Sequence, residues 1–563
     1  MTSQPVASVQ TATLLVYSDS QAQQAIASPQ FLSDWRVLAG QCPWGTALQS
    51  PEFVGTWYET YGELYRPLLF VRYSASGGMD GLMALAVERA SGRLTFAGAH
   101  QAEYNVWLAL PGEQSFILEC LDRLRQLGFP SLSFTYLPPG TPLDWLKNGW
   151  SNRSTLRAVQ RPLLTVDNVD ALVESLSKKK NRRRLEKLQE AGPLTFLEVE
   201  TCDALDNYYD EIIDFYDFRI GAVHGTCPFR DDPRKRVFYR ALMAKGLLHV
   251  TAMTIGETLV AAHIGIRNKN EVMLGIMGHS PFVAIHSPGK LHILHLGLVL
   301  HERGFVNLDL TPGGDAYKED RATRYDEAHE LTVFLNSKAL RSHRRSAALA
   351  SAAKRTLRIL HLDKAKLSRL RSLVRSPRHV PRAVASWISS STEMRFYRMK
   401  CSSAAESSGV HRDRLRDLLY YEPRQPEAPS KQEFLSTALE AIESGAHVYS
   451  VVRDGALVAS ARLLPAGRNS GAATASEYPP NSALIADIHV APEERMGAEF
   501  LKHIAHDAAN LAGAELVYIA VAAQDRALRS AVEEAGFQYQ NSVVREVRFG
   551  AAKTTRVMQR NYS

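Results

Sequence analysis

The sequence predicts an α/β (α+β) protein whose mixed sheets are flanked by helices. Short apolar segments with strand periodicity alternate with amphipathic helical segments along most of the chain. At 563 residues the chain is too long for one hydrophobic core, so several domains are expected. Two distant parts of the sequence also share a layout, in which antiparallel strands precede a strand, a turn, a helix, a strand and a second helix. We therefore expect tandem domains of one class.

The predicted elements divide the chain into four parts. These are a first domain over residues 12–160, a second over 161–337, a basic helical linker over 338–390 and a third domain over 391–563. In the first part, residues 67–75 and 81–90 predict paired strands because a glycine-rich turn joins them. A helix over 115–129, which ends at a glycine, and a strand over 131–137 are expected to follow.

The second and third parts predict the repeated layout. The second begins with one very basic helix over 175–192. Its remaining elements are predicted as a strand over 195–200, helices over 205–221 and 235–246, and strands over 247–255, 258–267 and 271–278. The third is predicted to hold a hairpin over 447–465, strands over 484–490 and 516–521, and helices over 497–513 and 526–537.

Composition excludes several classes of protein. Hydrophobic residues make up 45% and charged residues 22% of the chain, as in an ordinary globular protein. No apolar run reaches the ~18 residues that a membrane helix needs, and the first residues lack the pattern of an export signal. The five cysteines form no C-x-x-C pair, so we expect reduced thiols, no metal site and a cytoplasmic protein.

Positive charge is concentrated in one segment. Residues 338–382 contain fourteen Lys or Arg and one acid, Asp363, whereas the rest of the chain is slightly acidic. Such a segment is usually a solvated helix, but it would also suit peripheral contact with an anionic membrane surface or with a biosynthetic complex. Nucleic acid is not expected as a partner because no aromatic residues are interleaved with the basic ones.

The turn Ser287-Pro288-Gly289-Lys290 is a candidate anion site. Ser287 predicts an N-cap, and Pro288 fits the first position of a helix. The free amides and positive dipole end of such a helix favour an anion, and Lys290 adds a cation. A plain helix start explains the same residues. A P-loop is excluded, because Ala284 stands where that motif needs glycine and Leu291 where it needs Ser or Thr.

Histidines in the helix after this turn raise the question of a metal. His292 and His295 are three residues apart, and His286 and His301 are nearby. No carboxylate or cysteine stands at ligand spacing, and the rest of the helix is apolar. We therefore expect these histidines to pack in the core or to line a pocket.

The order of these motifs resembles a known family. The stretches "SLSKKKNRRRLEKLQEAG", "FYDFRIGAVHG", "RVFYRAL", "LVAAHIGI", "HSPGKLHILH" and "LDLTPGGDAYK" resemble, in order, the second half-domain of GNAT acyltransferases of the CelD/BcsL group. This group was named for a link to cellulose biosynthesis and is related to the Fem peptidyltransferases. The stretches "QSPEFVGTWYETYGE", "GLMALAV" and "FAGAHQAEYNVWLA" resemble its first half-domain, so the resemblance covers about residues 12–335. It implies tandem GNAT-like domains.

The resemblance also implies the chemistry. An acyl-CoA would place its pyrophosphate at the helix start, which assigns Ser287, Gly289 and Lys290 to its binding. The acceptor would attack the thioester directly, so the protein would position both substrates and remove a proton. By position, the candidates for catalysis are His263, Asp309, Asp315 and Tyr317, and those for substrate contact are Arg219, His224 and Lys318. For each, a cap or a hydrogen-bonded polar group is the alternative.

The third domain also resembles a GNAT domain, with departures. Glu494 and Glu499 occupy the ends of its anion turn, and a carboxylate there would repel a pyrophosphate. Val532 stands where the family has a tyrosine that often protonates the leaving thiolate. We therefore expect this domain to have a weak or lost active site and a structural or acceptor-binding role.

The sequence thus predicts an acyl-CoA-dependent N- or O-acyltransferase that needs no metal. Its expected acceptor is a sugar or a precursor of the cell envelope or of an exopolysaccharide, and its expected location is the cytoplasm or the inner face of the membrane. Three alternatives remain. They are a Fem-like transferase that uses aminoacyl-tRNA, a long-chain acyltransferase acting on a lipid amine, and a non-catalytic scaffold in a biosynthetic complex.

Overall fold

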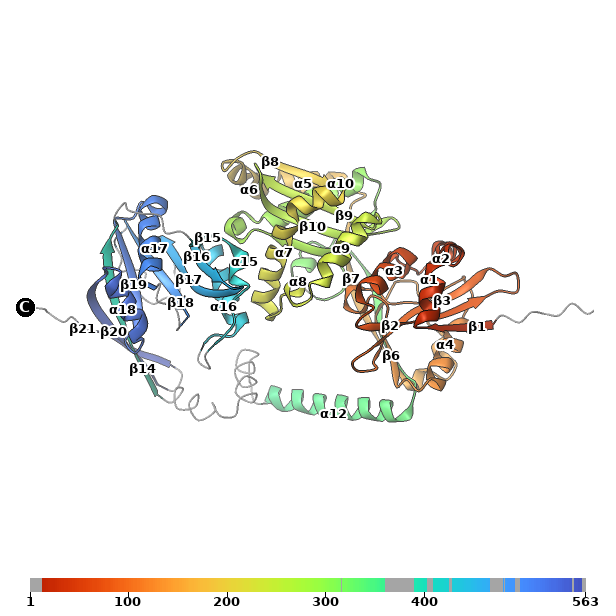
Figure 1. The fold of residues 1–563 in the computed structure, drawn as a ribbon. Helices are drawn as coiled ribbons and strands as arrows, with labels where there is room; N and C mark the ends of the chain where they lie inside the picture. Colours follow the sequence, from red (N-terminus) through yellow and green to blue (C-terminus); the bar gives the residue numbers. More distant parts are fainter. Residues whose placement is uncertain are drawn as a thin grey trace, which may run out of the picture. The chain divides into compact units, whose positions relative to one another are not determined.

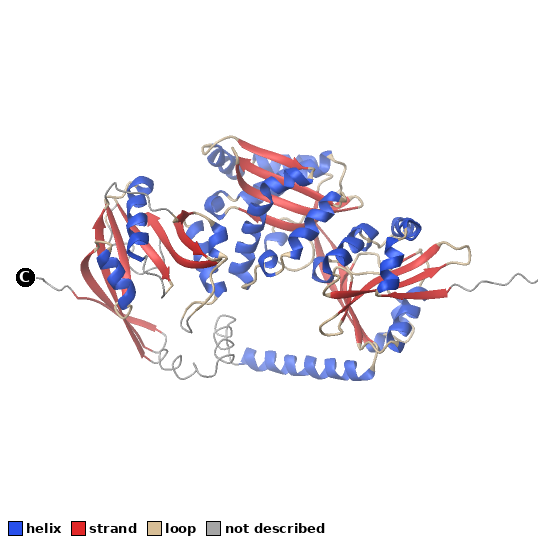
Figure 2. Ribbon diagram, viewed as in Figure 1, coloured by secondary structure: helices blue, strands red, loops and turns tan. Residues whose placement is uncertain are grey.

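The structure is a computed structural model that describes residues 13–314, 316–359, 389–401, 409–424, 428–465, 479, 481–491, 497–548 and 551–558. The chain forms two compact units. The first comprises Met1–Ile212, Asp232–His279 and His286–Ala353, and the second comprises Ile213–Asp231, Ser280–Ile285 and Lys354–Ser563. Each unit contains a mixed sheet flanked by helices, which confirms the predicted α/β class (Figures 1 and 2).

An antiparallel sheet begins the first unit. Its strands are β1 (Thr13–Ser18), β2 (Tyr65–Tyr73), β3 (Met79–Glu88), β4 (Leu94–Phe96) and β5 (Leu108–Ala109). The helices of this region are α1 (Ser20–Ala27), α2 (Pro29–Gln41), α3 (Pro51–Tyr61) and α4 (Ser115–Gln126). The predicted pairing of β2 with β3 is confirmed, and the fully buried Trp35, Trp57 and Trp107 belong to the core of this region. The sequence did not predict β1, which pairs with β2.

The second sheet of this unit joins segments that the sequence assigned to different domains. Its order is β6-β13-β7-β12-β11-β10-β9-β8. Its strands are β6 (Ser131–Leu137), β7 (Ser154–Thr165), β8 (Leu194–Val199), β9 (Leu248–Ile255), β10 (Thr258–Asn268), β11 (Glu271–His279), β12 (Asn307–Asp309) and β13 (Arg324–Phe334). Because β6 pairs with β13, and β7 spans residue 160, the two halves of the expected tandem share one sheet.

Strand β12 is short and pairs with only the first part of β11. Strands β9 to β11 form the predicted series and are antiparallel, β8 adds to it beside β9, and β11 and β12 are parallel. Their pairing runs only from Glu271–Asn307 to Met273–Asp309, and β11 then continues to His279 without β12. Helix α10 (Pro288–Glu302) connects these two strands and packs Ile293, Leu296 and Leu300 into their apolar core.

The other helices of this region largely match the prediction. They are α5 (Val169–Ser177), α6 (Lys179–Gln189), α7 (Cys202–His224), α9 (Arg234–Ala244), α11 (Ala316–Glu319) and α12 (Ser337–Ile359). The prediction of one helix over 175–192 is wrong, because Lys178 has an extended ψ of 133° that separates α5 from α6. The side chain of Asn181 accounts for the break, since it donates to the Ser175 carbonyl at 2.7 Å and caps the end of α5.

The second unit is built around one sheet in the order β15-β16-β17-β18-β19-β14-β20-β21. Its strands are β14 (Ser389–Lys400), β15 (His411–Arg412), β16 (His447–Arg453), β17 (Ala456–Pro465), β18 (Ser482–Val490), β19 (Leu516–Ala522), β20 (Gln538–Arg548) and β21 (Ala551–Met558). Its helices include α8 (Pro228–Asp231), α15 (Leu415–Leu418), α16 (Lys431–Glu443), α17 (Gly497–Ala512) and α18 (Arg526–Glu534). The predicted hairpin and the strand–helix–strand after it are confirmed.

The basic segment begins as a helix, as predicted. Helix α12 covers its first part, up to Ile359, and the rest of the segment up to residue 382 lies outside the described residues. In the described ranges, none of the helices combines the length and the apolar character needed to cross a membrane.

Candidate functional site

The start of α10 has an unusual backbone. Ser287 occupies the N-cap position and Pro288 the first turn, as predicted. The expected side-chain cap is wrong, because Ser287 is left-handed, with φ 51° and ψ 54°, and makes no capping hydrogen bond. A capping side chain needs an extended backbone to reach the amides of the first turn. A left-handed serine is uncommon, and backbone strain of this kind gathers at binding sites.

The first turn of α10 offers a donor to an anion. The Ser287 carbonyl accepts hydrogen bonds from the amides of Lys290 and Leu291, at 3.0 and 3.2 Å. Pro288 has no amide hydrogen, so Gly289 carries the first-turn amide that has no backbone acceptor among the described residues. A Cβ on Gly289 would lie 3.0 Å from His279 Nδ1, so glycine permits this turn to approach the end of β11.

Positive side chains surround the same turn. Burial lowers the pKa of Lys290, and the neighbouring charges of Arg184, Arg321 and Lys180 lower it further. Lys180 and Arg184 are one turn apart on α6, so both lie on the same face of that helix. The nearby carboxylate of Asp320 acts to raise the pKa of Lys290. Like charges gathered at a helix start favour an anionic ligand, because the ligand would relieve their repulsion.

Asp309, at the end of β12, is locked in a buried network. Its side chain is fully buried, and its Oδ2 accepts hydrogen bonds from the Tyr104 hydroxyl at 2.7 Å and from Arg161 Nη1 at 3.1 Å. Its Oδ1 accepts from the Thr311 amide at 2.8 Å. Burial raises the pKa of Asp309 to about 6, although Arg161 acts against this. These contacts favour a role in holding the sheet together over proton transfer to a substrate.

Arg161 extends this network across the sheet. Its guanidinium binds Asp326 with two hydrogen bonds, at 2.7 and 2.8 Å, and also donates to Glu271 at 3.0 Å. Glu271, Asp309 and Asp326 lie on β11, β12 and β13, so one cation from β7 ties three other strands together. Such a bidentate, buried arrangement fixes the position of β12 relative to β11.

The short helix α11, which follows β12, carries another buried cation. Lys318 Nζ donates to the carbonyl and hydroxyl oxygens of Thr311, at 3.3 and 3.1 Å, and Thr311 has a left-handed φ of 60°. Desolvation raises the pKa of Glu103, although the nearby charges of Lys318 and Lys235 act to lower it. Although neighbouring atoms crowd its carboxylate, Glu103 as a residue is exposed to solvent, so a substrate could reach this ionisable group near the end of β12.

His263 lies in a cluster of buried histidines beneath α10. His249, His263 and His292 are each at most 1% exposed. Among the described residues, neither ring nitrogen of His249 or His263 has a hydrogen-bond partner, while His292 Nε2 contacts the Thr251 hydroxyl at 2.9 Å. Burial lowers the pKa of all three, to about 4 for His249 and about 3 for His292. Full burial favours a packing role for His263, and its assignment as a catalytic residue stays a prediction.

The structure does not test the remaining predicted site residues. Asp315 lies outside the described residues, as does the side chain of Tyr317. Arg219 and His224 lie at the end of α7, in the second unit. Their assignment to the acceptor pocket therefore stays a prediction. In the described part of the chain, no group of three or more His, Cys, Asp or Glu residues is arranged to hold a metal.

Sequence reasoning missed several residues of this site. Lys180, Arg184 and Arg321 join Lys290, and His279 packs against Gly289. The spacing of Lys180 and Arg184 was a usable signal, because residues four apart share a helix face. Nothing in the sequence placed that face next to α10, since the two helices are far apart along the chain.

A comparison with known protein families identifies a domain in this part of the chain. Residues 175–319 match the family described as an acetyltransferase (GNAT) domain. This match confirms the GNAT-like part of the resemblance and supports an acyltransferase. The assignment to the CelD/BcsL group stays a prediction. A comparison with curated proteins gave no match.

Several solved structures are similar in fold. One is FemX, with 11% identity over 55% of this chain and 96% of its own, at a TM-score of 0.39. Another is a conserved protein of unknown function from Bacteroides thetaiotaomicron, with 9% identity over 54% of this chain and 97% of its own, at a TM-score of 0.38. A tandem GNAT protein from the clavulanic acid biosynthesis pathway has 13% identity over 57% of this chain and 99% of its own, at a TM-score of 0.35.

Proposed function

We propose that this protein is an acyltransferase that takes its acyl group directly from acyl-CoA, bound at the start of α10. The observation that carries the proposal is the cluster of Lys290, Lys180, Arg184 and Arg321 around the strained turn at Ser287. A diphosphate would accept a hydrogen bond from the Gly289 amide and, with its two negative charges, offset part of the charge of the four cations. Strand β11 continues to His279 beyond the end of β12, which supports a thioester lying along this part of β11.

The proposed reaction is direct transfer. The acceptor amine or hydroxyl attacks the thioester carbonyl, the carbon–sulfur bond breaks, the acceptor loses a proton and the thiolate gains one. We propose a sugar or an envelope precursor as the acceptor, as in the CelD/BcsL group. Of the ionisable groups near the end of β12, Glu103 is exposed, whereas Asp309 is buried and held by three hydrogen bonds. We therefore assign proton removal to Glu103 ahead of Asp309.

Calorimetric titration with CoA, acetyl-CoA and a long-chain acyl-CoA tests the donor. Wild type should bind at least one of them, and Gly289→Asp should abolish binding because it places a carboxylate against His279 and the anion. Gly78→Asp is the matched control, since Gly78 is exposed, has ordinary φ and has no close neighbour. Absence of binding to every CoA species would refute the proposal. Unchanged binding in Gly289→Asp would move the site away from α10.

A Fem-like transferase that uses aminoacyl-tRNA is the second candidate. The observation that favours it is the row of exposed cations Lys179, Arg182 and Arg183 on α6, which have no acid partner among the described residues. Free cations on one helix suit a phosphate backbone. Binding of aminoacyl-tRNA that is tighter than binding of any CoA species would favour this candidate. CoA binding without acyl transfer to any amine or sugar acceptor would instead favour a scaffold.

A further inference from the structure

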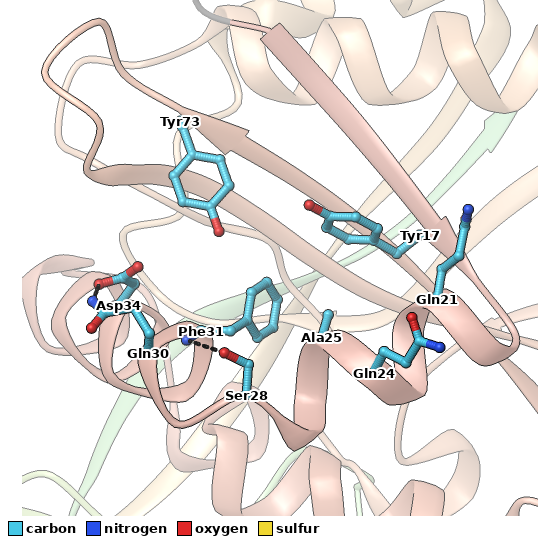
Figure 3. Close-up of a pocket in the computed structure, with 9 residues that line it drawn as sticks. All are labelled: Tyr17, Gln21, Gln24, Ala25, Ser28, Gln30, Phe31, Asp34 and Tyr73. Carbon is cyan, nitrogen blue, oxygen red and sulfur yellow. Dashed lines mark hydrogen bonds between the residues drawn. The ribbon is translucent and has the colours of Figure 1, made fainter.

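A cavity of ≈ 430 Å³ lies on the first sheet, among β1, β2, α1 and α2 (Figure 3). Its lining combines aromatic rings with polar groups. The rings are those of Tyr17, Phe31 and Tyr73, and the polar side chains include Asp34 and the amides of Gln21, Gln24 and Gln30. None of these residues belongs to the α10 site, and neither the sequence motifs nor the family match assigns them a role.

The rings come from three elements and converge. Tyr73 stands opposite Thr13 in the pairing of β1 with β2, so Tyr17, four residues along β1, lies on the same face of the sheet. The rings of Tyr17 and Phe31 have centroids 6.3 Å apart and planes at 83°. Figure 3 shows the hydroxyls of Tyr17 and Tyr73 pointing toward the space above the Phe31 ring.

The polar groups of the cavity retain hydrogen-bonding capacity. The hydroxyls of Tyr17 and Tyr73 and the amides of Gln21 and Gln24 make no hydrogen bond with the described part of the chain. Asp34 accepts one, at Oδ1 from Gln30 at 2.8 Å. Burial raises the pKa of Tyr73, as do the nearby Tyr17 and Asp34, so this phenol stays a neutral donor. The cavity therefore offers both donors and acceptors around an aromatic floor.

The charge of the lining restricts the ligand. Asp34 is the charged side chain among the lining residues, which include neither Lys nor Arg. A nucleotide, a phospholipid or CoA would bring a phosphate next to this carboxylate without a compensating cation. A planar base would need rings that face each other, whereas Tyr17 and Phe31 are nearly perpendicular. An acyl chain would leave the amides and the carboxylate unpaired.

We propose that this cavity binds one sugar unit of a saccharide that carries no negative charge. A sugar ring has an apolar C–H face, which packs on an aromatic ring, and a rim of hydroxyls, which bond to phenols, amides and a carboxylate. Both kinds of group are present, and the cavity has the size of a small-ligand pocket. The site is separate from α10, so it stands whether or not the protein transfers an acyl group.

Calorimetry with neutral oligosaccharides of linked glucose and of linked N-acetylglucosamine tests the proposal, with an oligogalacturonate as the anionic comparison. We expect binding of at least one neutral ligand with a Kd of about 1 mM or tighter, and no binding of the oligogalacturonate. Absence of binding to every neutral ligand would overturn the proposal, as would tighter binding of the anionic one.

Variants locate the binding. Tyr73→Ala should weaken it about tenfold because the packing ring is lost, and Tyr73→Phe should weaken it less because only the hydroxyl is removed. Asp34→Asn should also weaken it. Tyr208→Ala, which removes a half-buried tyrosine of α7, should bind like wild type. Gly289→Asp should retain saccharide binding even where it abolishes CoA binding, so the two proposals can fail separately. Wild-type affinity in folded Tyr73→Ala would overturn the assignment.

Discussion

The chain builds a strand–helix–strand arrangement twice, and the two copies differ in charge at the start of the helix. In the first unit, α10 connects the parallel strands β11 and β12, and in the second unit α17 connects the parallel strands β18 and β19. The first turn of α10 has Lys290 with three neighbouring cations. The first turn of α17 has Glu499, which pairs with Lys502 at 2.8 Å. The two helix starts therefore differ in the charge of their described side chains, which is consistent with the anion site proposed for α10 alone.

The glycine at each helix start also differs in its surroundings. Gly289 packs against the imidazole of His279, whereas a Cβ on Gly497 would lie 3.0 Å from the Cβ of Ala531 on α18. Val532 on that helix is fully buried, so the position where the family has a tyrosine contributes to the core. Glu494 lies outside the described residues. The residues around a helix start thus decide whether it can bind an anion. The weak or lost active site expected in the second unit stays a prediction.

The strands that follow the two helices end in different residues. Substituting the residue that ends β12 is expected to have the largest effect of the changes considered. Strand β12 ends at the locked Asp309, whereas β19 ends at Ala522. Asp309→Ala should lower the free energy of unfolding of the first unit by about 3–5 kcal/mol, because it leaves Tyr104 unpaired and Arg161 undercompensated. Urea unfolding followed by tryptophan fluorescence measures this, since six of the seven tryptophans precede residue 151.

A matched variant separates structure from catalysis at this residue. Asp309→Asn keeps the shape of the side chain and should cost less stability than Asp309→Ala. If Asp309 were instead the general base, Asp309→Asn would abolish acyl transfer while the folded protein kept its CoA affinity. That outcome would contradict the structural role.

The cation cluster provides the next largest effect. Lys180→Glu combined with Arg184→Glu should weaken CoA binding about 100-fold, because two charges beside the diphosphate are reversed. Lys179→Glu combined with Arg182→Glu is the control, since these residues lie on another face of α6 and the change in net charge is identical. Calorimetry at two salt concentrations measures both.

The same pair of variants distinguishes the two candidate functions. If α6 binds the backbone of a tRNA, both double variants should weaken tRNA binding, and the dependence on salt should be steep. Equal loss of CoA affinity in the two variants would show that the charge acts at long range rather than at the α10 turn.

The buried histidines should make the first unit sensitive to acid. Their folded-state pKa values lie below about 6.5, the ordinary value, so their contribution to stability is complete above that pH and is lost as the pH falls below it. Each histidine contributes a slope of about 1.4 kcal/mol per pH unit there. Asp309 has the opposite effect, because its pKa is raised to about 6 in the folded state. Between its unfolded-state pKa and pH 6, it stabilises the folded protein as the pH falls.

A variant isolates one histidine from these opposing groups. His263→Leu should reduce the slope by about 1.4 kcal/mol per pH unit between pH 6 and 5, while the other groups titrate as in wild type. It should also retain acyl transfer near neutral pH, since the ring makes no hydrogen bond that the variant would lose. Loss of activity in a folded, CoA-binding His263→Leu would support the catalytic assignment instead.

Local signals made most of the fold predictable. The strands β9, β10 and β11, the turn at Pro288 and helix α10 depend on residues close in sequence, and all were predicted. Long-range pairing was not. Nothing in the sequence indicates that β6 pairs with β13, or that Arg161 binds Asp309. The cation cluster was missed for the same reason, because α6 and α10 are far apart in the sequence.

The smallest expected effect compares two serines at helix starts. Ser430 begins α16 in the second unit, and its hydroxyl accepts from the Glu433 amide while Glu433 bonds back to Ser430. Ser430→Ala should therefore cost about 1 kcal/mol, measured as faster amide hydrogen exchange in α16. Ser287→Ala should leave exchange in α10 nearly unchanged, because the left-handed Ser287 makes no cap. If the Ser287 hydroxyl contacts the diphosphate, the same variant should still lower CoA affinity. A loss of stability in α10 as large as that in α16 would show that Ser287 caps its helix in solution, and the turn would then be an ordinary helix start.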